Sequence, residues 1–131
     1  MIFVDTSALI AFLDRDATSH GEVVARAAEV FRERRGITHN YVLIETAALA
    51  LRRLGAVAAR RLLEDVVPVL ELVWVDAELH NAAVAAHLRS LRRRRSLVDH
   101  VSFELMRRRG VRSALALDQD FARAGFVLVP T

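Results

Sequence analysis

Short apolar runs alternate with segments of helical periodicity along the whole chain. Continuous apolar runs predict buried strands at residues 2–4, 72–75, 114–117 and 126–129, and a shorter run at 37–38 is a weaker candidate. Between them, apolar residues recur every three or four positions, which predicts helices at 8–13, 22–35, 41–53, 56–66, 77–91 and 99–109. Buried strands that alternate with helices indicate a mostly parallel sheet covered on both faces, and therefore an α/β fold.

Polar residues and glycines mark the expected ends of these helices. Two segments, Ser19 to Glu22 and Ser96 to Asp99, have the spacing of a capping box at a helix start, and Asp76 is placed to cap the helix at 77–91. Three glycines stand where helices should stop: Gly36, Gly55 and Gly110. The chain shows no internal repeat or low-complexity linker, so its 131 residues are expected to form one domain, 1–131.

The composition indicates in which cellular compartment the protein is expected. Hydrophobic residues make up 53% of the chain, yet charges interrupt every apolar stretch before the roughly 18 residues needed to cross a bilayer. The first thirteen residues lack a basic leader and carry Asp5 within their apolar run, which disfavours a secretory signal. Because the chain has no cysteine, disulfides and thiolate metal sites are excluded. We therefore expect a cytoplasmic protein that does not associate with membranes.

All 19 basic residues are arginines. The absence of lysine excludes P-loop nucleotide sites and Schiff-base enzymes, because both depend on a lysine amine. Arginine forks suit phosphate oxygens, and the run Arg92, Arg93, Arg94 and Arg95 is the candidate for RNA binding. A run of solvated side chains would give the same pattern, so the arginines alone do not decide between the two interpretations.

Carboxylates follow several of the predicted strands. Asp5, Asp76 and Asp118 each come directly after an apolar run, and ligand sites in parallel sheets lie beyond the carboxyl ends of the strands. Glu45 is expected on the core-facing side of its helix, with Val42, Ala48 and Leu49. Asp99 opens a helix whose following residues point inward. These acids are therefore expected to meet at one rim of the core.

Several carboxylates at one rim repel each other. At a separation of ~4 Å and an effective dielectric near 20, each like-charged pair costs about 4 kcal/mol. Protonation or a cation must relieve this repulsion. Ligands that are all oxygen favour Mg²⁺ or Mn²⁺, which bind substrate phosphates and can activate a water molecule. The chemistry predicted from the residues is phosphodiester hydrolysis.

Four short segments that contain these acids resemble the acidic motifs of PIN domains, in order and in spacing. They are Val4-Asp5-Thr6-Ser7-Ala8-Leu9, Tyr41-Val42-Leu43-Ile44-Glu45-Thr46, Leu97-Val98-Asp99-His100-Val101-Ser102-Phe103 and Ala116-Leu117-Asp118-Gln119-Asp120-Phe121. Each motif alone is weak, whereas four in order are specific. The chain is most similar to the compact VapC-type toxins of bacterial toxin–antitoxin pairs.

This resemblance implies a three-layer α/β/α sandwich and a Mg²⁺- or Mn²⁺-dependent endoribonuclease that cleaves RNA with a metal-activated water. It also implies products with 5′-phosphates, an antitoxin of the VapB type as partner, and a homodimer. The implied metal ligands are Asp5, Glu45, Asp99 and Asp118. Two alternatives stay open: a nuclease that processes RNA without being a toxin, and a PIN-like module that holds RNA or protein without cutting. Val98 and Ala116 motivate the second alternative, since many relatives carry a hydroxyl residue there.

Several acids also have a purely structural interpretation. Asp5 is placed to cap the helix that follows it, and Ser96 with Asp99 would form a capping box without any metal. Asp118 is favoured as the fourth ligand, with Asp120 as a further contributor to the metal site. Asp76 matches no acidic motif and is interpreted as a helix cap. Thr6 is expected to be an accessory hydroxyl at the site.

Overall fold

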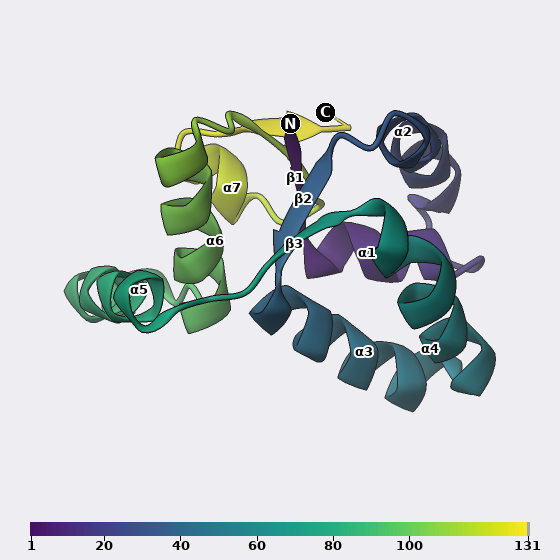
Figure 1. Ribbon diagram of the computed structural model, residues 1–131, viewed down its shortest axis with the longest axis horizontal. Coiled ribbons are helices and arrows are strands. Elements are labelled where there is room, and N and C mark those ends of the chain that lie inside the picture. Colours follow the sequence, from purple (N-terminus) through teal and green to yellow (C-terminus); the bar gives the residue numbers. More distant parts are fainter. Residues whose placement is uncertain (131) are drawn as a thin grey trace.

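The computed structural model describes residues 1–130, and within them five strands form one parallel sheet with helices on both faces (Figure 1). The strands are β1 (Ile2–Val4), β2 (Gly36–His39), β3 (Glu71–Val73), β4 (Ser113–Leu115) and β5 (Val127–Val129). Their order is β3-β2-β1-β4-β5, and every neighbouring pair is parallel. The predicted α/β sandwich is confirmed. Thr131, the last residue of the expected domain, lies outside the described residues.

The helices form two layers that enclose the sheet. They are α1 (Thr6–Leu13), α2 (His20–Arg32), α3 (Asn40–Leu54), α4 (Ala56–Arg61), α5 (Ala77–Arg89), α6 (Leu97–Arg109) and α7 (Asp120–Arg123). In Figure 1, α5, α6 and α7 lie on one side of the sheet, while α1, α2 and α4 lie on the other, and α3 leads away from the end of β2. Among the helices of residues 1–130, none has the length and apolar character needed to span a membrane.

The strand at 37–38, the weakest in the sequence pattern, is central in the structure. It extends over Gly36–His39, all four residues are buried, and it pairs with both β1 and β3. Two other strands end earlier than predicted, because the apolar runs continue into exposed residues: Trp74 is 71% exposed and Leu117 is 37% exposed. Asp76 and Asp118 therefore follow their strands after a short loop and not directly.

Several predicted helix ends are confirmed and others are wrong. Gly55 and Gly110 end α3 and α6 with positive φ angles of 98° and 65°, a conformation that glycine adopts without strain. Gly36 does not stop a helix: it begins β2, where an added Cβ would lie 2.5 Å from Leu70 Cδ2. Ser19 precedes α2, but its side chain makes no capping hydrogen bond.

The helix expected at 56–66 is divided in the structure. It consists of α4 followed by one π-helical turn, η1 (Leu62–Val66), and a short 3₁₀ turn, η2 (Val67–Val69), leads from there to β3. The extra residue in the π turn changes the helical register, and both Leu62 and Val66 are buried in the core. A single period of 3.6 residues could not have revealed this division.

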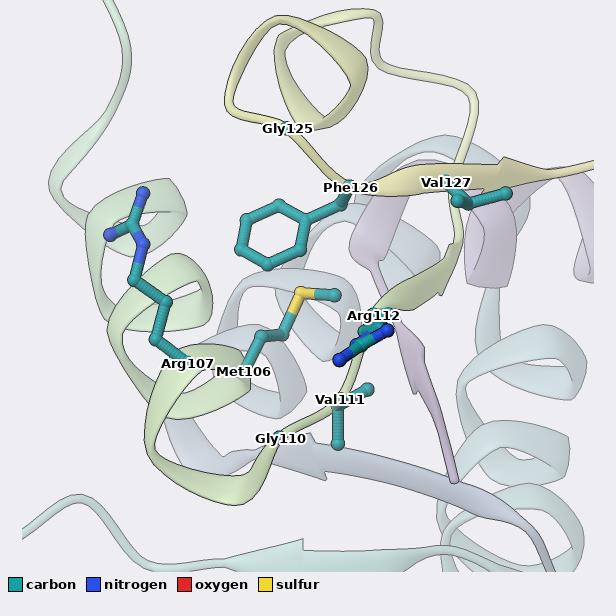
Figure 2. A pocket seen from close by; sticks show the side chains of 8 residues that line it. All are labelled: Met106, Arg107, Gly110, Val111, Arg112, Gly125, Phe126 and Val127. Atoms are coloured by element: carbon teal, nitrogen blue, oxygen red, sulfur yellow. The ribbon is translucent and has the colours of Figure 1, made fainter.

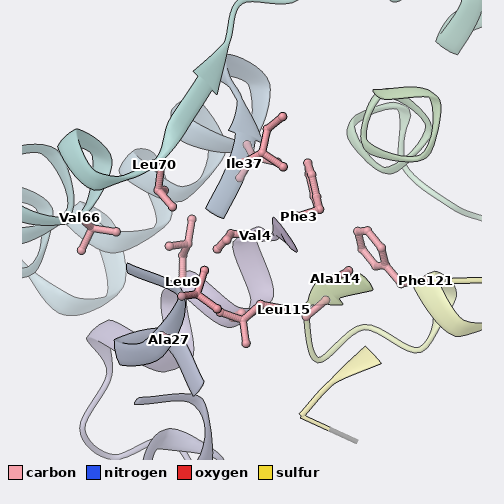
Figure 3. Packing of buried hydrophobic residues seen from close by; sticks show 14 of the residues in the cluster. Phe3, Val4, Leu9, Ala27, Ile37, Val66, Leu70, Ala114, Leu115 and Phe121 are labelled. Carbon is pink, nitrogen blue, oxygen red and sulfur yellow. The ribbon is translucent and has the colours of Figure 1, made fainter. Parts of the chain in front are cut away.

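Aromatic and branched side chains fill the two spaces between the layers (Figure 3). Phe3 of β1 stacks on Phe121 of α7 at a centroid distance of 5.9 Å, and Phe103 of α6 meets Phe121 edge to face at 5.0 Å. On the other face, Val4 and Leu115 are buried with Leu9 of α1. This packing fixes the helix starts α1, α3, α6 and α7 around the carboxyl edge of the sheet.

Candidate active site

The ends of β1 and β4 hold two carboxylates close together. The backbone N–H of Asp5 donates to the Leu115 carbonyl at 3.0 Å, which continues the pairing of the two strands. Ser7 joins the same segments, because its hydroxyl donates to Asp5 Oδ2 at 2.7 Å and accepts from the Leu117 N–H at 2.9 Å. Asp5 is thereby attached to the loop that carries Asp118.

Two further carboxylates, Asp99 and Asp120, converge on Asp118. One side-chain oxygen from each of Asp99, Asp118 and Asp120 lies within 4.8 Å of the others. Asp118 Oδ1 also accepts from the Asp120 N–H at 2.9 Å, which folds the loop so that both side chains face α6. Asp118, favoured from the sequence as the fourth ligand, and Asp120, expected as a further contributor, thus lie at the same site.

Asp99 has a structural role as well as a place in this cluster. The predicted capping box is confirmed: Asp99 Oδ2 accepts from the Ser96 N–H at 3.3 Å, and Ser96 Oγ accepts from the Asp99 N–H at 3.0 Å. Burial, together with the charges of Asp5 and Asp118, raises the pKa of Asp99 to about 6. The capping hydrogen bonds oppose this rise but do not cancel it.

Burial is also the main reason that the pKa of Asp5 is raised, and the Asp118 charge adds to it. The hydrogen bonds from Ser7 lower the pKa of Asp5, because they stabilise the ionised form. Asp5 caps α1 through the Ser7 N–H at 3.2 Å, so the structural interpretation of Asp5 is also correct. A capping role alone does not explain why other carboxylates surround it.

Glu45 reaches the site from α3. Its pKa is raised by burial and then by the Asp99 charge, which places the two carboxylates near each other. The expected face of α3 is partly wrong: Val42 is buried as predicted, but Ala48 is exposed and Thr46 takes the inward position. Thr46 donates to the hydroxyl of Thr6 at 3.0 Å, which fixes α3 against α1 and brings Thr6 to the same region.

The donor set fits a hard divalent cation. The residues at this edge offer carboxylate oxygens, and burial together with mutual repulsion disfavours their ionised forms. A cation would reverse that preference, and Mg²⁺ and Mn²⁺ select oxygen ligands. Within residues 1–130, no histidine belongs to such a cluster. Asp76 stands apart as the N-cap of α5, where it accepts from the Leu79 N–H at 2.8 Å, as predicted.

Of the four candidate RNA-binding arginines, two line a hollow next to the acidic cluster and two do not. Arg93 and Arg95 line a hollow of about 380 Å³ together with Asp120 and Arg123, so this hollow shares Asp120 with the acidic cluster. Arg92 and Arg94 are exposed and do not line it. Arg123 lies outside the predicted run and forms an ion pair with Asp120 at 3.0 Å.

A second hollow of about 380 Å³ opens at the opposite edge of the sheet, between the end of α6 and the starts of β4 and β5 (Figure 2). Its lining contains no carboxylate among the described residues: Met106, Arg107, Gly110, Val111, Arg112, Gly125, Phe126 and Val127. This hollow lacks the donors that a metal or a proton transfer would need, so the acidic edge is the candidate active site.

Sequence reasoning did not identify two residues that build the site. The hydroxyl of Ser7 joins Asp5 to the β4–α7 loop, a contact between distant segments that the sequence pattern does not indicate. His39 is fully buried, caps α3 through Nδ1, and contacts Ser102 of α6. Histidine is an uncommon helix cap, so the sequence contained no signal for this role.

Known proteins match the chain along nearly its whole length. A 23S rRNA-specific endonuclease, VapC20 of Mycobacterium tuberculosis, is 39% identical over 132 residues, which is 98% of each chain. The crystal structure of M. tuberculosis VapC20, described as a sarcin–ricin loop cleaving toxin, superposes with a TM-score of 0.83 at 34% identity and covers 97% of both chains.

A more distant structure has the same fold. FitAcB of Neisseria gonorrhoeae superposes with a TM-score of 0.73 at 14% identity, over 98% of this chain and 96% of that one. The PIN domain matches residues 2–127, a range that contains the entire acidic edge. The expected family is confirmed: this chain belongs to the PIN-domain family.

Proposed function

We propose that this protein is a divalent-metal-dependent endoribonuclease and the toxin of a VapBC-type toxin–antitoxin pair. The observation that carries the proposal is the convergence of Asp99, Asp118 and Asp120 within 4.8 Å, beside a buried Asp5. Isolated acids would not raise each other's pKa, whereas those of Asp5 and Asp99 are raised by neighbouring carboxylates in addition to burial. The 39% identity to a 23S rRNA-specific endonuclease supports RNA as the substrate.

The carboxylates would hold Mg²⁺ or Mn²⁺. In this proposal Asp5, Glu45, Asp99 and Asp118 are the ligands, and Asp120 contributes directly or through a water. A divalent cation bound there lowers the pKa of a coordinated water and offsets negative charge on the phosphate. Ser7 holds the Asp5 carboxylate in place, and Thr6, attached to Thr46, is an accessory hydroxyl of the site.

The proposed reaction is hydrolysis. A water oxygen attacks phosphorus, the bond from phosphorus to the 3′-oxygen breaks, and the leaving oxygen takes up a proton. The products are a 3′-hydroxyl and a 5′-phosphate. The sarcin–ricin loop of 23S rRNA is the proposed target, because the related toxin is described as cleaving that loop.

The test compares two carboxylates that both cap helices. Purified protein is incubated with 23S rRNA in Mg²⁺, Mn²⁺ or EDTA, and the products are mapped at single-nucleotide resolution. Asp5→Asn keeps one acceptor oxygen for Ser7 but removes the charge, so cleavage should fall by more than 100-fold, a loss of roughly 3 kcal/mol of transition-state stabilisation. Asp76→Asn alters a cap remote from the acids and should cut normally.

Undiminished cleavage by Asp5→Asn, or cleavage that continues in EDTA, would contradict the proposal. If the protein retains RNA without any metal-dependent cleavage, the non-catalytic alternative motivated by Val98 and Ala116 is favoured instead.

An antitoxin and a second copy of the chain complete the proposed assembly. Ile44 and Leu51 of α3 and Leu63 of η1 are at least half exposed, and such apolar side chains suit a protein interface. Light scattering of the purified protein should give the mass of a dimer. Co-expression with the neighbouring reading frame should yield a complex that no longer cuts RNA. A lone gene without such a neighbour would favour an RNA-processing nuclease.

A further inference from the structure

The hollow beside the acidic cluster contains a buried cation, Arg95, that forms no ion pair with any described residue. Arg95 is only 9% exposed, and no carboxylate of residues 1–130 lies within 4.0 Å of its guanidinium nitrogens. Its Nε–H is buried and has no hydrogen-bond partner among the described residues. Arginine does not lose its proton in proteins, so burial leaves a charge that needs compensation.

Aromatic packing orients this charge but compensates it only in part. The Arg95 guanidinium lies over the Phe103 ring, 5.5 Å from its centroid, and such contacts contribute about 0.5–2 kcal/mol. The neighbouring His100 does not compensate it either: the pKa of His100 is lowered by burial first, and then by the charges of His87 and Arg95. Arg95 is therefore held in a fixed place that favours an anion.

Two other arginines make the hollow suitable for a phosphate. The chain turns through η3 (Leu91–Arg93) and a left-handed residue, Arg94, with φ of 58°, so that Arg93 and Arg95 line the hollow together. Arg123 of α7 also lines it. Three guanidinium groups against the single carboxylate of Asp120 give the lining a net positive charge, and guanidinium forks match phosphate oxygens.

We propose that this hollow, defined by Arg93, Arg95 and Arg123, binds a phosphate of the RNA strand next to the one that is cut. Asp120 belongs both to the hollow and to the acidic cluster, so a strand with one phosphate at the cluster has its neighbouring phosphate within reach of Arg95. Phosphate contacts of this kind set the position of a strand on a protein and carry no base specificity. The inference rests on the proposed nuclease function and names the residues that position its substrate.

The test uses a hairpin RNA with the sarcin–ricin loop sequence, bound in EDTA so that it is not cut. The variants are Arg95→Met, which keeps an apolar stem against Phe103, and Arg93→Gln and Arg123→Gln, which change exposed side chains. Each should weaken binding by about tenfold, as expected for one lost charged hydrogen bond. Each should also reduce the slope of log affinity against log salt by about 0.7, the value for one phosphate of a single strand.

Arg112→Gln is the matched control, because it removes the same charge at the opposite edge of the sheet. It should leave affinity and salt slope close to wild type. Thermal unfolding of every variant establishes that it is folded. If Arg95→Met is unstable, the variants Arg93→Gln and Arg123→Gln, which change exposed side chains, still test the proposal.

A second readout identifies the phosphate itself. A series of hairpins carries one uncharged methylphosphonate linkage at successive positions, and wild-type protein should lose affinity at one linkage beside the cleavage position. The Arg95→Met variant should no longer distinguish that linkage from its neighbours. If wild-type protein binds and cuts RNA while the three variants behave like Arg112→Gln, this inference is wrong and the nuclease proposal stands. If wild-type protein neither binds nor cuts, the nuclease proposal fails first.

Discussion

The ring of His39 and the hydroxyl of Ser102 meet 2.9 Å apart in the buried centre of the protein. His39 Nδ1 accepts from the Val42 N–H at 3.3 Å, so Nε2 carries the proton and donates to Ser102, whose hydroxyl donates in turn to the Val98 carbonyl at 3.0 Å. This chain of hydrogen bonds joins the start of α3, which carries Glu45, to the first turns of α6. Burial lowers the pKa of His39 to about 4, so the ring is neutral at physiological pH.

Ser102→Ala should destabilise the protein. The substitution leaves the Nε2–H of His39 buried without an acceptor, a situation that costs about 1–3 kcal/mol. Urea unfolding monitored by circular dichroism would measure the loss. Ser19→Ala serves as the control, since the Ser19 side chain makes no capping hydrogen bond, and its effect should stay within about 0.5 kcal/mol. Equal stability of the two variants would refute the role given to this hydrogen bond.

Two glycine substitutions should have opposite effects. Gly36→Ala places a methyl group 2.5 Å from Leu70 Cδ2 and 3.2 Å from Val30 Cγ1, and overpacking of this kind costs about 1–3 kcal/mol. Gly21→Ala meets no atom within 4 Å and lies in α2, where alanine is favoured over glycine by roughly 0.5–1 kcal/mol. Chemical denaturation of both variants would test this, and a stabilising Gly36→Ala would show that the strand has room to move.

The metal-free protein should become more stable when Asp99 is replaced by Asn. The pKa of Asp99 is about 6 in the folded state, against 3.8 for the free side chain. Between these values the folded state binds more protons than the unfolded state, so the stability contributed by Asp99 falls as pH rises through this window. Asn keeps the cap of α6 and removes the charge. The gain should be largest above pH 6 and disappear near pH 4.

Thermal unfolding in EDTA from pH 4 to pH 8 would measure the difference in stability between wild type and Asp99→Asn. His39 is present in both proteins, so the effect of its titration cancels in this difference. Addition of Mn²⁺ at pH 7.5 should stabilise the wild type and leave the variant nearly unchanged. A constant difference across the pH range would mean that burial and the neighbouring carboxylates do not raise the pKa of Asp99 in the folded protein.

The parallel sheet and the meeting of several acids at its carboxyl edge were predictable because they follow from local patterns. Asp5 and Asp118 could be placed together because parallel strands present their carboxyl ends at one edge. Ser96 and Asp99 could be recognised as a capping box from their spacing alone. Each of these features depends on only a few neighbouring residues. Distant segments then meet because the carboxyl ends of parallel strands lie at the same edge of the sheet.

Other features depend on contacts that no local pattern contains. Trp74 and Leu117 are apolar yet exposed, so the pattern extended β3 and β4 beyond their last paired residues. Gly36 stands before a strand because Leu70 occupies the space a side chain would need, and only the packed structure shows this. Arg95 differs from Arg94 in burial although both belong to one run of arginines, because the turn at Arg94 directs its neighbour over Phe103.

Glu45 provides the sharpest test of which acids bind the metal, because it reaches the site from a helix and takes part in no capping hydrogen bond that the structure shows within residues 1–130. Its pKa is raised by burial and by Asp99, so a cation that contacts Asp99 should also stabilise the ionised form of Glu45. Glu45→Gln should therefore weaken Mn²⁺ binding by about 10- to 100-fold, the range for groups that contact or orient metal ligands. Calorimetric titration at pH 7.5 would measure this change, with the exposed Glu22→Gln as control.

Because a metal displaces protons from carboxylates of raised pKa, the affinity of the wild type for Mn²⁺ should also fall as pH decreases below 6. An affinity that is independent of pH and of Glu45 would place the cation away from α3, on Asp118 and Asp120 alone.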